Sequence, residues 1–199
     1  CISDGIIVIY TIGGEGVIPY RTDCIQWDTY RTQGYFDVQY SVDNGVSWTT
    51  IGNQVNGSSR IKQWPIPNSV SGQALVRVSR DGISGQSSDV FSIIDFPKNI
   101  NINNVCECEF SISWNEVPFA AKYEISVLGE KYMDSIGSTT ETSYNIPIDS
   151  PSDEVWFSVR AITENGTKGV RAVAKYYNGS GVSNCLLNSN FYTNKSHKM

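Results

Sequence analysis

The sequence is poor in the features that mark membrane-spanning helices, nucleic-acid binding and helical folds. No apolar run approaches the roughly 18 residues that a membrane helix needs, so we predict no membrane-spanning helix. The 15 Lys and Arg residues are outnumbered by 20 Asp and Glu residues and form no cluster. Because binding to a nucleic-acid backbone depends on clustered cations, nucleic acid is not an expected partner. Ala, Leu and Met, which favour helices, are also scarce.

The sequence also lacks a recognisable catalytic or metal-binding pattern. Its single histidine, His197, lies in a polar C-terminal stretch, whereas a general base needs a fixed position beside its substrate. The segment Cys106-Glu107-Cys108 has no second cysteine pair and no suitably placed histidine to complete a metal site. We therefore predict that the protein is not an enzyme and has no catalytic residue, no metal site and no cofactor.

Aromatic residues are abundant, at 12% of the chain, and the clearest pattern among them is a hairpin. Phe36, Val38 and Tyr40 alternate with polar residues, which predicts a half-buried strand. Asn44-Gly45 supplies the positive φ angles that a tight hairpin turn requires. The stretch from Val46 to Ile51 is expected to return as the second strand.

Similar alternating stretches recur along the chain and predict an all-β protein with two tandem β-sandwiches. The length accommodates two domains of about 100 residues each. We expect residues 1–95 to form the first sandwich, residues 96–185 the second, and residues 186–199 a C-terminal tail. The Asn-rich stretch 99–104 is expected to lie in the junction between them. Four tryptophans are predicted to pack in the cores: Trp27, Trp48, Trp64 and Trp114.

Each half resembles a known family of β-sandwich modules. The first half, in the run GGE…IQWD…VQYSVDNGVSWTTI…WPIP…ALVRVS, resembles an immunoglobulin-like repeat of secreted and surface proteins of the Bacteroidota. The second half, in the run ISWNEV…AAKYEISV…SYNIPI…VWFSVRAI, resembles a fibronectin type III domain. Trp114 and Tyr123 match the core tryptophan and tyrosine of that family, whereas Val155 departs from its usual tyrosine. The resemblance of the first half implies a spacer, adhesion or assembly module.

The first residue, Cys1, looks like the first residue of a mature bacterial lipoprotein, whose thiol and amine carry lipid. The alternative is that the chain is a truncated piece of a longer protein. Lipid on Cys1 would make the protein exported and anchored to a membrane without spanning it. The expected location is then the outer membrane or the cell surface, with a secreted or periplasmic location as the alternative.

The remaining cysteines permit disulfides in an exported protein. In the fibronectin type III topology, the start of the second strand and the end of the last strand lie at the same pole. This resemblance implies a bridge from either Cys106 or Cys108 to Cys185. The sequence leaves open whether Cys24 is free or paired.

Two further residues are candidates for surface roles. Trp156 is out of phase with the core positions Phe157 and Val159, so we expect it to face outward and to serve as a contact residue. Asp134-Ser135-Ile136 resembles the three-residue O-glycosylation motif of exported Bacteroidota proteins, with Ser135 as the acceptor.

These observations favour a non-catalytic, exported binding or scaffolding protein. We expect a lipid-anchored subunit of a bacterial outer-membrane or cell-surface assembly, with other proteins of that assembly as partners. The loops 29–34, 81–88 and 163–169 are expected to select the partner, because loops at the poles of a sandwich can dock other proteins. The alternative is a carbohydrate-binding accessory module of a polysaccharide-uptake or secreted enzyme system, with a glycan as the ligand.

Overall fold

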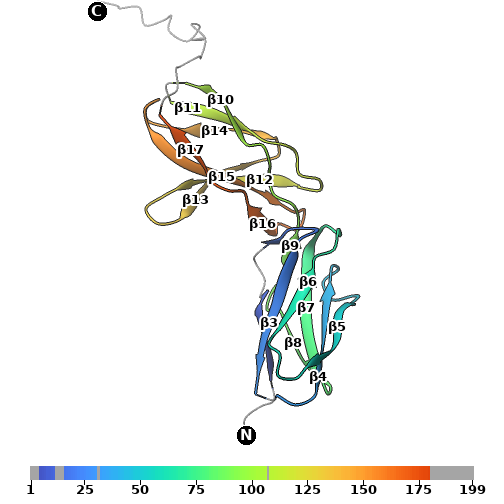
Figure 1. Ribbon diagram of the computed structural model, residues 1–199. Coiled ribbons are helices and arrows are strands. Elements are labelled where there is room, and N and C mark those ends of the chain that lie inside the picture. The colour runs from blue at the N-terminus through green and yellow to red at the C-terminus, as the bar shows by residue number, and fades with distance from the viewer. Residues whose placement is uncertain (1–4, 12–15, 31, 107, 180–199) are drawn as a thin grey trace, which may run out of the picture.

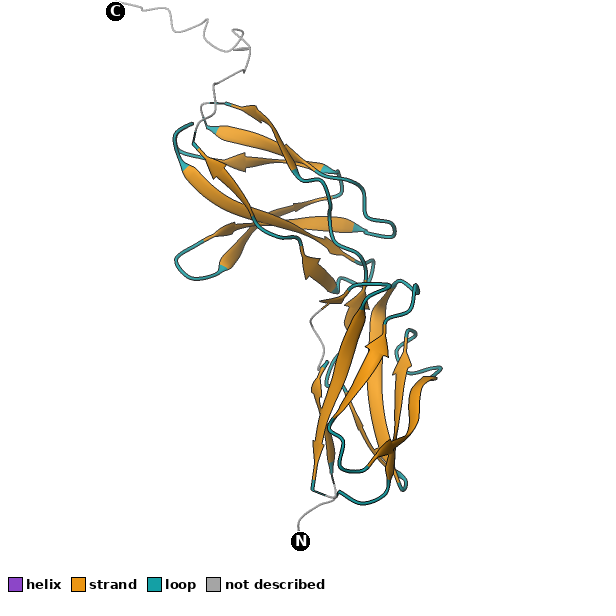
Figure 2. Ribbon diagram, in the orientation of Figure 1, coloured by secondary structure: helices purple, strands orange, loops and turns teal. Residues whose placement is uncertain are grey.

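The computed structural model describes residues 5–11, 16–30, 32–106 and 108–179, and every regular element within these ranges is a β-strand. Figures 1 and 2 show two sandwiches of strands arranged end to end. The predicted all-β fold class is therefore confirmed. None of the described elements is a helix that could cross a membrane.

The strands follow one another along the chain without intervening helices. They are β1 (Ile6–Tyr10), β2 (Gly16–Val17), β3 (Thr22–Thr29), β4 (Tyr35–Ser41), β5 (Thr49–Asn56), β6 (Ile61–Pro65), β7 (Ser71–Arg80), β8 (Ile83–Gln86), β9 (Phe91–Ile93), β10 (Asn101–Val105), β11 (Glu109–Ser113), β12 (Lys122–Leu128), β13 (Met133–Thr139), β14 (Ser143–Pro147), β15 (Glu154–Ile162), β16 (Lys168–Arg171) and β17 (Lys175–Asn178).

The first sandwich packs a sheet of order β1-β3-β6 against a sheet of order β2-β9-β7-β4-β5, in which β8 also pairs with β7. Large aromatic side chains fill the space between the sheets. Trp27 packs edge-on against Phe36, with ring centroids 5.4 Å apart, and Trp64 packs edge-on against Phe91 at 6.0 Å. All four side chains are fully buried, so the core depends on aromatic volume contributed by both sheets.

The second sandwich packs a sheet of order β10-β11-β14 against a sheet of order β13-β12-β15-β16, in which β17 also pairs with β15. Trp114 and Tyr123 are buried and meet edge-on at 5.2 Å, as expected of core residues. Phe110 on β11 contacts Phe157 at 5.4 Å and stacks on Tyr177 at 4.6 Å. These contacts join the two sheets across the core.

The predicted hairpin forms, but its turn is longer than expected. Strand β4 pairs with β5, and Asn44 and Gly45 have φ angles of 56° and 83°. The second strand begins at Thr49 and not at Val46. The prediction that Trp48 packs in the core is wrong. Its half-buried ring lies 4.1 Å from the guanidinium carbon of Arg77, and this cation–π contact holds it on the surface of the sheet.

The turn itself is organised by Asp43. Its carboxylate accepts hydrogen bonds from Ser41 Oγ at 2.7 Å, from the Ser47 backbone N–H at 2.8 Å and from Ser47 Oγ at 2.5 Å. These hydrogen bonds lower the pKa of Asp43 to about 2. Asp43 is thus the residue that closes this hairpin.

The chain passes between the sandwiches in a way that the sequence did not indicate. The Ile94 backbone N–H donates to Val17 O in the first sandwich at 3.1 Å, while the Ile94 side chain packs in the core of the second. Part of the Asn-rich stretch 99–104, expected to be junction, belongs to strand β10 and pairs with β11. No alternating pattern in the sequence predicts this strand, because its side chains are mostly exposed.

The two sandwiches meet through their backbones. A Cβ atom added at Gly72 would lie 2.3 Å from Thr163 Oγ1, and one added at Gly169 would lie 2.6 Å from Ile94 Cγ2. Across this contact Thr167 Oγ1 donates to Gly72 O at 2.8 Å, and Ser92 Oγ donates to Lys168 O at 2.9 Å. The absence of side chains at the glycines is what permits this close approach.

Two of the three loops expected to select a partner have other roles. The 163–169 segment contains the residues that pack against Gly72, so it joins the sandwiches. The 81–88 segment contains strand β8, which pairs with β7. The 163–169 segment therefore contacts the first sandwich of the same chain, and about half of the 81–88 segment belongs to a sheet.

We predict that Gly72→Val loosens the junction. The new Cβ would meet Thr163 Oγ1 at 2.3 Å and Thr167 Oγ1 at 2.6 Å, both of which are held by hydrogen bonds. In residual dipolar coupling measurements, the two sandwiches of the wild type should share one alignment tensor, whereas those of the variant should need two. Gly85→Ala is the matched control, because its Cβ would meet Ile6 O at 2.2 Å inside the first sandwich only. A single shared tensor for Gly72→Val would contradict a close-packed junction.

Candidate binding surface on the second sandwich

An exposed aromatic pair lies on the outer face of the β12-β15-β17 side of the second sandwich. Trp156 on β15 is 45% exposed, and Tyr176 on the paired strand β17 is 40% exposed. Their rings stack with centroids 4.9 Å apart and an interplanar angle of 28°. The outward direction expected for Trp156 is thus observed, and its role as a contact residue stays a prediction.

The aromatic pair is bordered by a carboxylate. A hydrogen bond with Glu154, together with the cost of desolvation and the charge of that carboxylate, raises the pKa of Tyr176 above 10.0. The phenol therefore stays neutral at physiological pH. It presents a flat ring to solvent with its hydroxyl already engaged.

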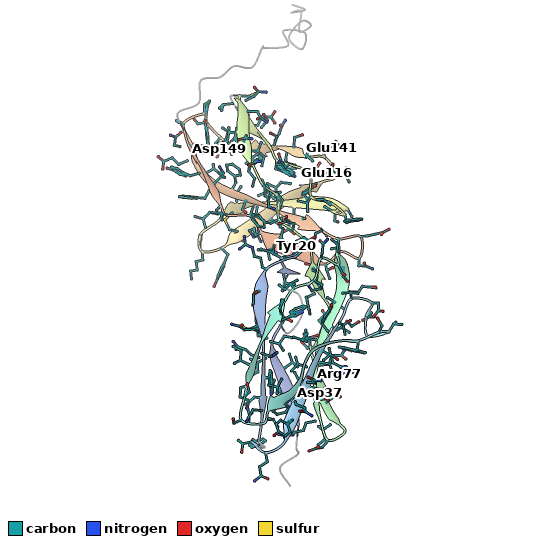
Figure 3. The ribbon with its side chains drawn as sticks, turned by 45° about the vertical axis from the view of Figure 1, so that its right-hand side comes forward. Tyr20, Asp37, Arg77, Glu116, Glu141 and Asp149 are labelled. Atoms are coloured by element: carbon teal, nitrogen blue, oxygen red, sulfur yellow. The ribbon has the colours of Figure 1, made fainter. Side chains whose placement is uncertain are left out.

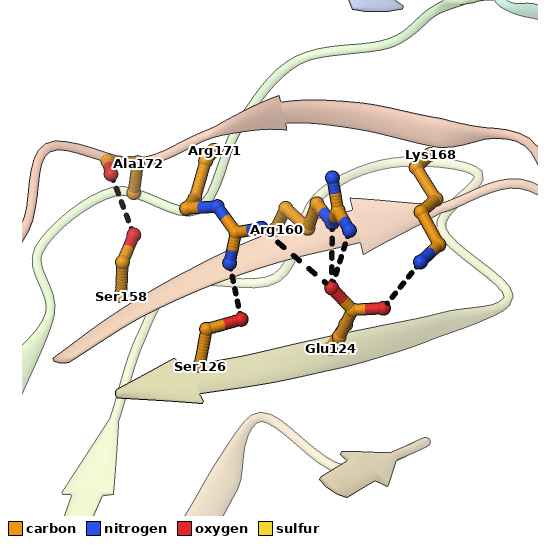
Figure 4. Close-up of polar contacts among 7 residues, drawn as sticks. All are labelled: Glu124, Ser126, Ser158, Arg160, Lys168, Arg171 and Ala172. Atoms are coloured by element: carbon orange, nitrogen blue, oxygen red, sulfur yellow. Dashed lines mark hydrogen bonds and ion pairs between the residues drawn. The ribbon is translucent and has the colours of Figure 1, made fainter. Parts of the chain in front are cut away.

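A second group of side chains on the same sheet surrounds Glu124 (Figure 4). Strand register places Glu124 opposite Arg160, and Arg160 opposite Arg171. Arg160 donates to Glu124 Oε1 from Nε at 2.8 Å and from Nη2 at 2.5 Å. Lys168 Nζ lies 2.9 Å from Oε2, and Arg171 Nη2 lies 3.9 Å from Oε1. Arg171 also donates to Ser126 Oγ.

The Glu124 cluster, meaning Glu124, Arg160, Lys168 and Arg171, is electropositive. Three cationic side chains surround one carboxylate, which leaves an excess of two positive charges on a chain whose net charge is −5. Burial and the charge of Arg160 lower the pKa of Arg171, although it remains protonated at neutral pH. Burial also opposes ionisation of Glu124, but hydrogen bonds from Lys168 and Arg160 prevail and hold its pKa below 4.5.

The aromatic pair and the Glu124 cluster share one face of the sheet. Trp156, Ser158 and Arg160 alternate along β15, so their side chains leave the same side. Four residues of strand separate Trp156 from Arg160 by about 13 Å. Leu128 on β12 is half exposed and extends the apolar end of this face. The face therefore combines a flat apolar patch, bordered by the Glu154 carboxylate, with a cationic patch.

The remaining predicted residues are distributed over other parts of the chain. Ser135 is exposed on β13, the edge strand of the same sheet, and its modification stays a prediction. Cys106 is disulfide-bonded, whereas Cys24 and Cys108 are free. Cys185, like Cys1, lies outside the described residues, so the predicted pairing stays a prediction. The described residues hold no group of three or more His, Cys, Asp or Glu side chains that could bind a metal ion.

The Glu124 cluster and Tyr176 were not among the candidates identified from the sequence. A signal for the β15 members was present, because the same alternation that turns Trp156 outward also turns Arg160 outward. Nothing local to Glu124 or Arg171 indicates that they meet Arg160, since strand order decides that contact.

Comparisons with known proteins find similarity only at the level of structure. No protein-family model matches the chain, and no curated protein sequence matches it. A solved structure described as a mutant of FN3tt is 21% identical over 42% of this chain and 92% of its own, with a TM-score of 0.38. The FN1–FN3 domains of chicken CNTN1 are 15% identical over 83% of this chain and 64% of their own, with a TM-score of 0.36. The FN5 domain of Drosophila Lar is 20% identical over 41% of this chain and 90% of its own, with a TM-score of 0.33.

We predict that the Glu124 cluster makes the second sandwich sensitive to acid. Because the pKa of Glu124 is lowered on folding, its stabilising contribution is complete above pH 4.5 and is lost as the pH falls through the lower folded value. At pH 7, Glu124→Gln should lower the free energy of unfolding by about 2 to 3 kcal/mol, less than for a fully buried pair because the cations are partly exposed.

This difference should shrink as the pH falls below 4.5 and through the lower folded pKa, because wild-type Glu124 then loses its charge as well. Urea denaturation of both proteins across pH measures it. The control is Glu116→Gln, an exposed carboxylate on the same sandwich (Figure 3), which should change the free energy by less than about 0.5 kcal/mol. A difference for Glu124→Gln that is constant with pH would contradict this account.

Proposed function

We propose that the protein is a non-catalytic, exported binding or scaffolding protein, held by lipid on Cys1 in a bacterial outer-membrane or cell-surface complex. Its two cores use most of the large side chains for packing. The observation that carries the proposal is the stacked pair Trp156–Tyr176, half exposed beside a cationic cluster with unneutralised charge.

The composition of this face suits a protein partner. Trp, Tyr and Arg are the residues enriched at positions that dominate binding energy in protein interfaces. Trp156 and Tyr176 are already stacked, so they lose little conformational freedom on binding. The excess positive charge of the Glu124 cluster favours a partner segment that carries Asp or Glu residues. It also makes a protein partner a better fit here than a neutral sugar.

The cysteines support an exported location. Disulfides persist in oxidising compartments and are rare in reducing ones, and Cys106 is disulfide-bonded. We propose Cys185 as its partner. Phe110, four residues after Cys106, stacks on Tyr177, which is eight residues before Cys185. Strand β17, which precedes Cys185 in the sequence, therefore lies close to the start of β11, which follows Cys106.

We predict that Trp156→Ala weakens binding of the protein partner. Tagged wild-type and variant proteins are isolated from membranes of the native host, and co-purifying proteins are quantified by mass spectrometry. A defined set of membrane proteins should fall about tenfold or more with Trp156→Ala and with Arg160→Glu, because both patches contribute to one interface. Tyr132→Ala, an exposed aromatic on the same sandwich, is the control and should change nothing. An unchanged set with both variants would refute this contact surface.

We predict two covalent features in a peptide map of the membrane-isolated protein. The N-terminal peptide should carry the mass of acyl chains on Cys1, since lipid is the proposed anchor. Under non-reducing conditions a peptide containing Cys106 should be linked to one containing Cys185, and the link should persist in Cys108→Ser. An unmodified Cys1 would refute the anchor, and a different partner for Cys106 would refute the pairing.

A further inference from the structure

A cleft of about 710 Å³ lies where the two sandwiches meet. Its walls come from both, with Tyr20 at the junction (Figure 3) and Phe119 on the side of the second sandwich. Its size falls within the roughly 300–1,000 Å³ of sites for small ligands, which occur preferentially at domain interfaces. It is separate from the face that carries Trp156.

Each sandwich contributes one aromatic ring to this cleft by the same turn. In Ile18–Arg21 the Arg21 N–H donates to Ile18 O, and in Val117–Ala120 the Ala120 N–H donates to Val117 O. Proline precedes the aromatic residue in both turns. Tyr20 and Phe119 have φ angles of 62° and 66°. This is the arrangement of a type II turn, in which glycine or asparagine normally occupies the aromatic position.

The aromatic residues in these turns gain little stabilisation from packing. Tyr20 is 77% exposed and Phe119 is 78% exposed, so neither ring is placed by burial. A bulky side chain with positive φ is strained, and glycine would relieve that strain at both positions. Strain of this kind, matched on two sides of one cleft, points to a role for the rings in binding.

The polar lining of the cleft defines the chemistry of the ligand. The side-chain amides of Asn68, Gln73 and Asn165 line it, and none of them has a hydrogen-bond partner within the described ranges. An amide both donates and accepts, as a hydroxyl group does. Asp95 and Glu164 also line the cleft, whereas no Lys or Arg does. The lining therefore suits hydroxyl groups and disfavours phosphates and carboxylates.

We propose that this cleft binds a short neutral oligosaccharide. Tyr20 and Phe119 stack on the C–H faces of two sugar rings, and the amides of Asn68, Gln73 and Asn165 hydrogen-bond to ring hydroxyls. The rings come from different sandwiches, so the close contact at Gly72 keeps them at a constant separation. The ligand thus bridges the junction.

The test uses the full chain and variants that retain the turns. Tyr20→Gly and Phe119→Gly keep the positive φ while removing the ring, so both should be at least as stable as the wild type. Tyr30→Ala, in the first sandwich and equally exposed, is the matched control. Binding is measured on an array of neutral and acidic glycans with proline-rich and acidic peptides. Each positive is quantified by titration calorimetry.

We expect binding to at least one neutral oligosaccharide, weakened about tenfold or more by each glycine variant, because each removes one stacking surface. Tyr30→Ala should bind as the wild type does. No binding to any neutral glycan, unchanged binding in both glycine variants, or preferred binding of acidic glycans or of peptides would each overturn the proposal. None of these outcomes involves Trp156, so the proposed protein partner is tested separately.

Discussion

The close backbone contact between the sandwiches is the constraint on which the arrangement of surfaces depends. Thr167 Oγ1 reaches Gly72 O, and any side chain at Gly72 would collide with Thr163. Glycine at this position costs conformational entropy on folding, but it lets two sheets meet where ordinary side chains would keep them apart. Because the sandwiches touch here, groups from both can line one cleft. A freely hinged pair would present the same residues without a defined separation.

Large aromatic side chains fill both cores, whereas a few aromatic side chains are exposed on the surface. The indole nitrogens of Trp27, Trp64 and Trp114 have no hydrogen-bond partner among the described residues. Burying an N–H without a partner costs free energy, so packing of the large ring prevails at these three positions. Trp156 is stacked on a neighbour in solvent, and Tyr20 is held in solvent by its turn. These exposed rings are the features on which the two proposed binding sites are based.

Period-two patterns in the sequence account for the strands that bury one face, and for the outward direction of Trp156. They do not account for β13, where few side chains are buried, or for β10, which lies in an Asn-rich stretch. Such strands are stabilised by pairing with β12 and β11, and an alternating pattern appears only where one face is buried. Trp48 occupies an alternating position that predicts burial, yet its ring lies on the surface of the sheet, where it makes a cation–π contact with Arg77.

The sequence by itself determined the all-β fold class, the turn at Asn44-Gly45 and the face from which each strand residue emerges. These properties are local, because side chains alternate along any strand and positive φ angles select particular residues. The tertiary structure decided which side chains meet. Glu124 contacts Arg160 because strand order places β12 beside β15. Gly72 contacts Thr167, 95 residues away, because the two folded sandwiches dock against each other. Contacts over such separations depend on packing of the whole chain, which no short stretch of sequence encodes.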